Sequence, residues 1–170
     1  MPGIVSKESI GKPLYTPEQR ERRDSTIWTV VQGILAPVQF LVFLISLALI
    51  GNYFITGDGY AMAAVSVILK TFALCAIMVT GAIWEKEVFG QYLLAPAFFW
   101  EDVVSFFVIA LHLSYVCVFA TNFISDDAKM WLALLAYAVY LINAAQFLLK
   151  LRAARLSSGP HSEPRREIVI

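Results

Sequence analysis

The sequence contains few of the residues and motifs that build metal, nucleotide or hydrolase sites. Its two cysteines, Cys75 and Cys117, each lie inside a long apolar run, where a small apolar-tolerant side chain packs easily. The motifs CxxC, HExxH and GxSxG and the glycine-rich phosphate loop do not occur. The sequence therefore gives no support to a metal cluster, a nucleotide site or a serine hydrolase, and we expect both cysteines to be packing residues.

Net charge and strand periodicity are lacking as well. Thirteen Lys and Arg balance 13 Asp and Glu, so the formal net charge of zero favours neither nucleic acid nor an acidic partner. Apolar and polar residues do not alternate as they do in barrel strands. We also expect no cleavable signal, because the first apolar run begins late and is longer than a signal-peptide core.

Apolar residues are what the sequence has in abundance. They make up 59% of the 170 residues, with a mean hydropathy of +0.69, which is more than a soluble domain of this size buries. They form runs long enough to cross a bilayer, which takes about 20 helical residues. We predict an all-α integral membrane four-helix bundle, preceded by an N-terminal segment (1–27) and followed by a mobile tail (151–170), with spans over residues 28–50, 60–83, 103–125 and 130–149.

The placement of Lys and Arg predicts the orientation in the membrane. Five basic residues precede the first span and five follow the fourth, whereas the two short turns on the opposite side hold only Lys129. The middle connection, residues 84–102, is aromatic and carries four acids, one lysine, Gly90 and Pro96. We therefore expect an interfacial middle segment, with this segment and both termini facing the cytoplasm. Asp126 or Asp127 is placed to cap the last helix.

Ionisable groups within a span are candidate functional residues, because burying each in a bilayer costs a few kcal/mol or more. Lys70 lies about ten residues from either end of its span, so it should face a partner or a water-filled cavity. A structural ion pair, or a neutral hydrogen-bonded amine, is the alternative. The neutral polar residues Gln32, Gln39, Ser46 and Asn143 are typical of the interhelical hydrogen bonds that hold membrane bundles together.

One face of the third span is polar. At 100° per residue, a narrow stripe should face the bundle interior, and it comprises Glu101, Ser105, Val108, His112 and Tyr115. His112 is either a hydrogen-bonded core residue or a ligand. Glu101 and Asp102 lie about 100° apart around the helix, so we do not expect them to share a proton.

Acidic residues are concentrated near the middle connection, at Glu85, Glu87, Glu101 and Asp102. A carboxyl group beneath interfacial aromatic side chains is partly desolvated, which favours its protonated form near neutral pH. Such a group can act as a general acid. An equally compatible alternative is that Glu85 pairs with Lys86 or with an arginine of a terminal segment.

Several stretches of the chain resemble the 3-vinyl (also called 2-vinyl) bacteriochlorophyllide hydratase family of phototrophic bacteria. The most specific are LAPVQF at 35–40, WEK at 84–86 and APAFFWED at 95–102. The resemblance covers most of residues 13–115, and its segments are 13–20, 28–40, 81–90, 95–102 and 110–112. The fourth span and the residues after 157 carry little of it.

The resemblance implies a hydro-lyase of bacteriochlorophyll synthesis in the bacterial inner membrane, cytoplasmic or intracytoplasmic. It would add water to the C3 vinyl group of chlorophyllide a, giving a 1-hydroxyethyl group. This reaction requires no redox cofactor and no metal ion beyond the magnesium of the substrate, so we expect no cofactor. Homo-oligomers or contacts with other pigment-synthesis enzymes stay open. The alternative is a non-enzymatic pigment-binding or assembly factor, and a small transporter is disfavoured because the chain has no internal repeat.

Residues that suit this reaction follow from its chemistry. Hydration of an alkene needs one well-placed acid and one held water, and we expect Glu101 or Asp102 to donate the proton while Glu85 orients the water or exchanges roles. The aromatic candidates for stacking on the macrocycle are Trp84, Phe98, Phe99 and Trp100. We expect His112 to be the axial ligand of the substrate magnesium and Lys70 to pair with the propionate. Glu101 and His112 lie about 16 Å apart along one helix, which makes it difficult for both to reach one ring.

Overall fold

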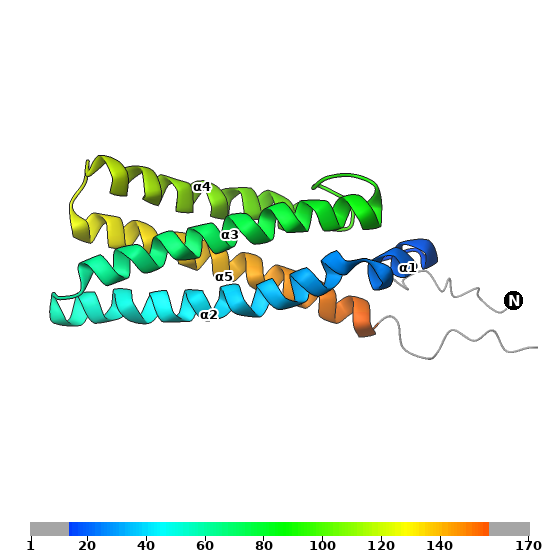
Figure 1. Ribbon diagram of the computed structural model, residues 1–170, viewed down its shortest axis with the longest axis horizontal. Coiled ribbons are helices and arrows are strands. Elements are labelled where there is room, and N and C mark those ends of the chain that lie inside the picture. Colours follow the sequence, from blue (N-terminus) through cyan, green and yellow to red (C-terminus); the bar gives the residue numbers. More distant parts are fainter. Residues whose placement is uncertain (1–13, 157–170) are drawn as a thin grey trace, which may run out of the picture.

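The computed structural model describes residues 14–156, and this part of the chain folds into helices joined by short connections. Four of the helices form an up-and-down antiparallel bundle, and the short helix α1 lies at one end of it (Figure 1). The helices are α1 (Pro17–Ser25), α2 (Ile27–Thr56), α3 (Tyr60–Phe89), α4 (Phe99–Thr121) and α5 (Asp126–Leu156). Helices α2 to α5 are each long and apolar enough to span a membrane. The prediction of an all-α fold with four apolar spans is confirmed.

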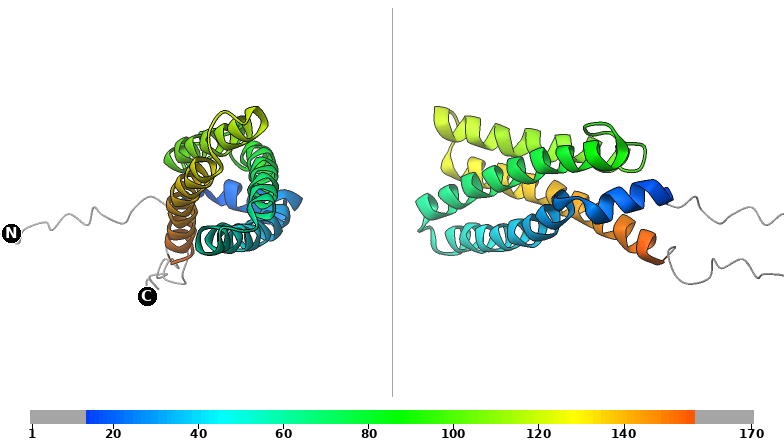
Figure 2. Two further views of the ribbon diagram at one scale, coloured as in Figure 1. Left: turned by 90° about the vertical axis from the view of Figure 1, so that its left-hand side faces the viewer. Right: turned by 45° about the vertical axis from the view of Figure 1, so that its right-hand side comes forward.

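Three of the helices extend well beyond the predicted spans, and they do so at both ends of the bundle. Helix α3 continues to Phe89 and α4 begins at Phe99, so only residues 90–98 of the middle connection are non-helical. This connection, α1 and the last turns of α5 lie at the same end (Figures 1 and 2), which we call the α1 end. The shared end agrees with the predicted topology, and which membrane face it occupies stays a prediction. Most of the predicted tail lies outside the described residues.

Helix α1 was not predicted, although its start signal is present in the sequence. Pro17 occupies the first turn, where its missing N–H is not needed. Thr16 and Gln19 form a capping box, in which each side chain accepts the backbone N–H of the other, at 3.2 and 2.9 Å. The predicted cap of the last helix was wrong: the Ala128 N–H donates to Ser125 Oγ, and Asp126 lies in the first turn, paired with Lys129 at 2.9 Å.

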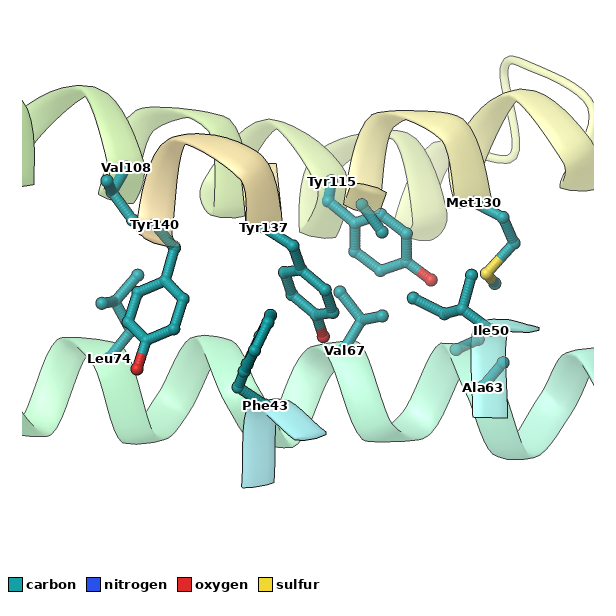
Figure 3. Close-up of a cluster of buried hydrophobic side chains, with 12 residues drawn as sticks. Phe43, Ile50, Ala63, Val67, Leu74, Val108, Tyr115, Met130, Tyr137 and Tyr140 are labelled. Carbon is teal, nitrogen blue, oxygen red and sulfur yellow. The ribbon is translucent and has the colours of Figure 1, made fainter. Parts of the chain in front are cut away.

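The bundle interior combines a hydrophobic cluster with polar side chains. Figure 3 shows much of the cluster, which α2, α3, α4 and α5 all supply and in which Phe43, Tyr137 and Tyr140 pack together. The buried residues of α2 are Gln39, Phe43, Ser46 and Ile50. They recur at spacings of four and three residues, which is the packing pattern of helices in antiparallel bundles. The outer faces carry many exposed large hydrophobic side chains, which is typical of helices that span a membrane.

Interhelical hydrogen bonds join all four long helices, as the polar residues of the spans predicted. Ser46 Oγ lies 2.7 Å from Ser66 Oγ and 2.5 Å from Tyr137 Oη, linking α2 to α3 and α5. The Asn143 amide donates to Ser105 Oγ at 2.7 Å, linking α5 to α4. The Gln32 amide donates to Thr80 Oγ1 at 2.7 Å, which closes the α2–α3 pair near the α1 end.

Replacing Ser46 with Ala is expected to destabilise the bundle by about 1 kcal/mol, because hydrogen bonds between membrane helices contribute about that much. Unfolding in mixed micelles titrated with a denaturing detergent measures the change. The matched control is Ser114→Ala, since Ser114 is exposed and its hydroxyl bonds only to the Ala110 carbonyl of its own helix. Equal stability of the two variants would contradict the role given to Ser46.

Candidate functional site

Two carboxyl groups from different helices meet at the α1 end of the bundle. Glu85, near the end of α3, is 4% exposed, and Asp102, in the first turn of α4, is 2% exposed. The backbone N–H groups of two consecutive residues, Leu94 and Ala95, bind one carboxyl each, which places the two carboxyl groups beside each other. We call Glu85 and Asp102 the carboxyl pair. Two buried carboxyl groups this close are stable with a single shared proton, because both cannot be ionised side by side at low cost.

The connection between α3 and α4 positions the carboxyl pair. Gly90 ends α3 in a left-handed conformation with a φ of 86°, which turns the chain back towards the bundle. The Leu94 N–H then donates to Asp102 Oδ2 at 2.6 Å and the Ala95 N–H donates to Glu85 Oε2 at 3.2 Å. Consecutive backbone groups thus bind the two carboxyls, one each.

This connection carries backbone strain. Leu93 and Leu94 have φ values of 61° and 56°, in the left-handed region that residues with a Cβ rarely adopt. Each such residue costs on the order of 1 kcal/mol or more and persists where surrounding contacts impose it. Here the imposing contacts include the two hydrogen bonds to the carboxyl pair, so the strain is located at the candidate site.

Glu101 has a different partner. Its Oε2 accepts a hydrogen bond from Lys150 Nζ of α5 at 2.5 Å, and the ammonium lies 5.2 Å from the centre of the Phe98 ring. Glu101 therefore differs from the carboxyl pair, in agreement with its predicted place on another side of α4. The alternative pairing of Glu85 with Lys86 is not observed, since Lys86 donates to the Gly90 carbonyl.

Aromatic side chains pack beside the carboxyl pair. Phe98 is 2% exposed and contacts the rings of Tyr15, Trp84, Phe89 and Phe147, with centroid distances of 5.7 to 6.5 Å. Trp84 also donates from Nε1 to Thr29 Oγ1 at 2.9 Å. Burial raises the pKa of the Tyr15 phenol, and the Arg23 guanidinium, 4.8 Å from the ring centre, opposes this effect.

The four predicted stacking residues do not gather on one surface. Trp84 and Phe98 lie in the packed layer, whereas Phe99 and Trp100 are 41% and 69% exposed on the outer face of α4. Exposed aromatic residues at the end of a membrane helix are also typical of the interfacial belt. The buried Phe98 and the half-buried Trp84 therefore lie inside the α1 end, whereas Phe99 and Trp100 lie on the outer face of the bundle.

Lys70 and His112 lie deep in the bundle. The predicted stripe of α4 is buried along its length, and His112 and Lys70 are both fully buried. His112 Nδ1 lies 2.7 Å from the Val108 carbonyl, and Lys70 Nζ lies 3.6 Å from the centre of the Tyr140 ring. Neither Lys70 Nζ nor His112 Nε2 has a hydrogen-bond partner among residues 14–156. The structure does not bring these two residues to the carboxyl pair.

The fold and the site together define a multi-pass membrane protein with two buried carboxyl groups, a type of side chain that can act as a general acid or base. Within residues 14–156, no three His, Cys, Asp or Glu side chains gather as a metal site would require. The sequence pattern of the 2-vinyl bacteriochlorophyllide hydratase family matches residues 15–153. The chain belongs to this family.

Two curated relatives agree with the family assignment. A 2-vinyl bacteriochlorophyllide hydratase of Cereibacter sphaeroides is 65% identical over 143 residues, covering 84% of this chain and 89% of the relative. One of Rhodobacter capsulatus is 60% identical over 148 residues, covering 87% and 86%. No solved structure matches the chain. The protein is thus a hydratase, an enzyme of the hydro-lyase class, with a role in bacteriochlorophyll synthesis.

Proposed function

We propose that this enzyme adds water to the C3 vinyl group of chlorophyllide a, or of a bacteriochlorophyllide, and forms the 3-(1-hydroxyethyl) pigment. The observation that carries the proposal is the buried carboxyl pair, Glu85 and Asp102, bound by two backbone N–H groups at the α1 end. Hydration of an alkene needs an acid and a base that act on adjacent carbons, and a carboxyl pair with one shared proton supplies both. The family relationship supports the same chemistry.

In the proposed mechanism, the shared proton is transferred to the terminal vinyl carbon. The electron pair of the double bond forms the new C–H bond, which leaves a cation on the carbon attached to the macrocycle. Water attacks this carbon, and the ionised carboxyl of the pair accepts the proton that the water loses. One water is consumed, and a proton shift within the pair restores the starting state.

The contacts favour Asp102 as the base and Glu85 as the acid. On the sequence alone, Asp102 was named as a possible proton donor and Glu85 was allowed to exchange roles with it. The Leu94 N–H lies closer to Asp102, at 2.6 Å, than the Ala95 N–H does to Glu85, at 3.2 Å. Hydrogen bonds from N–H groups stabilise a carboxylate, so the shared proton belongs on Glu85. Glu101, which pairs with Lys150 beside the carboxyl pair, is suited to stabilising the developing cation.

Substrate reaches the carboxyl pair from the lipid interface in this proposal. Displacing residues 90–98 breaks the two N–H bonds to the pair and also relieves the strain at Leu93 and Leu94. Phe99 and Trp100 at the outer edge, with Trp84 and Phe98 behind, offer surfaces for stacking on the macrocycle. Axial ligation of the substrate magnesium by His112 and pairing of the propionate with Lys70 were expected from the sequence, and they are the alternatives to the role proposed for these two residues in the next section. The inner-membrane location, with the α1 end in the cytoplasm, stays a prediction.

Replacing Trp100 with Leu is expected to raise KM about two- to tenfold and to change kcat little, because an aromatic stacking partner contributes about 0.5–1.5 kcal/mol. Steady-state hydration rates at varied pigment concentration measure this. Trp131→Leu is the matched control, since Trp131 is 63% exposed and lies on α5 near the opposite end of the bundle. Equal KM values for the two variants would remove Trp100 from the binding site.

The test of the proposed function uses membranes from a host without this pathway, with and without the protein. Chlorophyllide a is added anaerobically, without nucleotide or metal, and the pigments are separated and weighed by mass spectrometry. A product heavier by one water, dependent on the protein, is the expected result. Folded protein that binds the pigment and leaves it unchanged would instead support a pigment-binding or assembly factor.

A further inference from the structure

Each of the four long helices contributes at least one buried polar atom that has no hydrogen-bond partner within the described chain. Four of these atoms belong to side chains in the middle of the bundle: Gln39 Oε1 on α2, Lys70 Nζ on α3, His112 Nε2 on α4 and Asn143 Oδ1 on α5. Their side chains are at most 7% exposed. Because buried polar groups in proteins are nearly always hydrogen-bonded, four such atoms in the interior of one bundle indicate a bound molecule.

These four side chains surround one group of rings. Lys70 lies over the Tyr140 ring, and the His112 ring lies 5.7 Å from the Tyr137 ring. Phe43 packs against both tyrosines, at 5.2 and 5.1 Å, and Figure 3 shows the three rings next to one another between the helices. Gln39 is one helical turn from Phe43, and Asn143 is one turn from Tyr140. We call Gln39, Lys70, His112 and Asn143 the mid-bundle site.

The chemistry of the four atoms identifies the class of ligand. The Val108 carbonyl can only accept, so His112 carries its hydrogen on Nδ1 and presents a lone pair at Nε2. Gln39 Oε1 and Asn143 Oδ1 are acceptors too, whereas the Lys70 amine is a donor in its charged form. An anion would satisfy Lys70 and repel three acceptors, and a cation would do the reverse. Water both donates and accepts, and it needs two to four polar partners.

A row of polar groups connects the mid-bundle site to the α1 end. The Asn143 amide donates to Ser105 Oγ, one turn along α4 from Glu101. Gln146 Oε1, one turn further along α5, is another buried atom without a partner in the described chain. The next turn brings Lys150, whose side chain is 27% exposed and binds Glu101. The row thus runs from the centre of the bundle to the edge of the carboxyl pair.

We infer that the mid-bundle site and this row hold a chain of bound waters that supplies the water consumed at the carboxyl pair. The inference rests on the proposed hydration. A flat macrocycle that covers the α1 end separates the carboxyl pair from bulk water, while the reaction consumes one water in every turnover. An internal source supplies this water, and it gives a role to Lys70 at a position where a buried charge is costly.

Two variants separate the inferred role from a structural one. Lys70→Met replaces the amine with an apolar chain of similar length, and it is expected to leave stability unchanged or raise it. It should nevertheless lower kcat on the order of tenfold, with KM nearly unchanged, the pattern of a loss that does not involve substrate binding. Thr71→Val is the matched control, because Thr71 is 4% exposed and its hydroxyl is satisfied by the Val67 carbonyl.

The waters themselves are measured by radiolytic hydroxyl-radical labelling of the full chain in nanodiscs, followed by mass spectrometry. Bound water generates radicals in place, so Tyr137 and Tyr140 should be labelled although they are at most 5% exposed. Lys70→Met and His112→Phe should lose most of this labelling, and Thr71→Val should keep it. Wild-type turnover with unlabelled tyrosines would overturn the water chain and leave the hydratase intact. Labelling without turnover would support the water chain and overturn the proposed function.

A pigment-binding measurement tests whether His112 belongs to the water site or ligates the substrate magnesium. The absorption shift of chlorophyllide a on binding should be the same for His112→Phe and for the wild type. Loss of that shift, or of binding, would assign His112 to the substrate magnesium and overturn the water site.

Discussion

Replacing Glu85 with Gln, or Asp102 with Asn, is expected to lower kcat about 10²- to 10⁴-fold, the usual contribution of a positioned general acid or base. Each amide keeps the size of the side chain and an oxygen for the backbone N–H of Ala95 or Leu94. It cannot release a proton to the vinyl carbon or accept one from water. The double variant should be little worse than the more damaged single variant, because the two groups act as one unit.

Hydration rates and unfolding curves of the same preparations measure this effect. Glu87→Gln is the matched control, since Glu87 lies on the same turn of α3 but is exposed and accepts a hydrogen bond from Thr26. Its rate should equal that of the wild type. Glu101→Gln should have an intermediate effect, because Glu101 acts on the cation through its charge. Near-normal rates in Glu85→Gln and Asp102→Asn would remove the carboxyl pair from the mechanism.

Replacing Phe98 with Ala is expected to destabilise the protein by about 3 kcal/mol or more, the usual effect of deleting a buried phenyl ring. Phe98 is 2% exposed and joins the last turns of α3 and α5 to the connection that carries Leu94 and Ala95. Its removal leaves a void beside the carboxyl pair. Activity should therefore fall together with stability.

Detergent-induced unfolding of Phe98→Ala, compared with Phe98→Leu, measures the packing contribution, since Leu refills part of the space. The control is Phe123→Ala, because Phe123 is 85% exposed in the connection between α4 and α5. We expect the control to unfold like the wild type. A Phe98→Ala protein as stable as the control would show that the aromatic layer does not hold the α1 end together.

Much of the fold was predictable because its signals are periodic or local. Four apolar runs predicted four helices, and the spacing of 3.6 residues predicted which side of α4 is buried, from Glu101 to Tyr115. The hydrogen bonds of Ser46 and Asn143 followed the rule that neutral polar groups in spans bond between helices. Helix α1 was missed although the capping box at Thr16 and Gln19 is a local signal.

The partners within the site were not predictable, because they depend on contacts between distant segments. Glu85 and Asp102 were both candidates, but their carboxyl groups meet because the backbone at Leu93 and Leu94 is left-handed. Leucine rarely adopts this conformation, so the sequence did not predict it. Lys150 was counted only as a basic residue after the last span, and its ion pair with Glu101 depends on how α5 packs against α4. Which aromatic residues face inwards depended on where α4 begins.

The most direct test of hydration at the carboxyl pair is to incubate chlorophyllide a with the purified protein in nanodiscs, in deuterated water enriched in ¹⁸O. We expect one solvent deuterium on the new methyl group and one solvent oxygen on the adjacent carbon, formed without any redox reagent. The Glu85→Gln, Asp102→Asn double variant should bind the pigment and form almost none of this product. An unchanged pigment with the wild-type protein, or a double variant as fast as the wild type, would contradict hydration at the carboxyl pair.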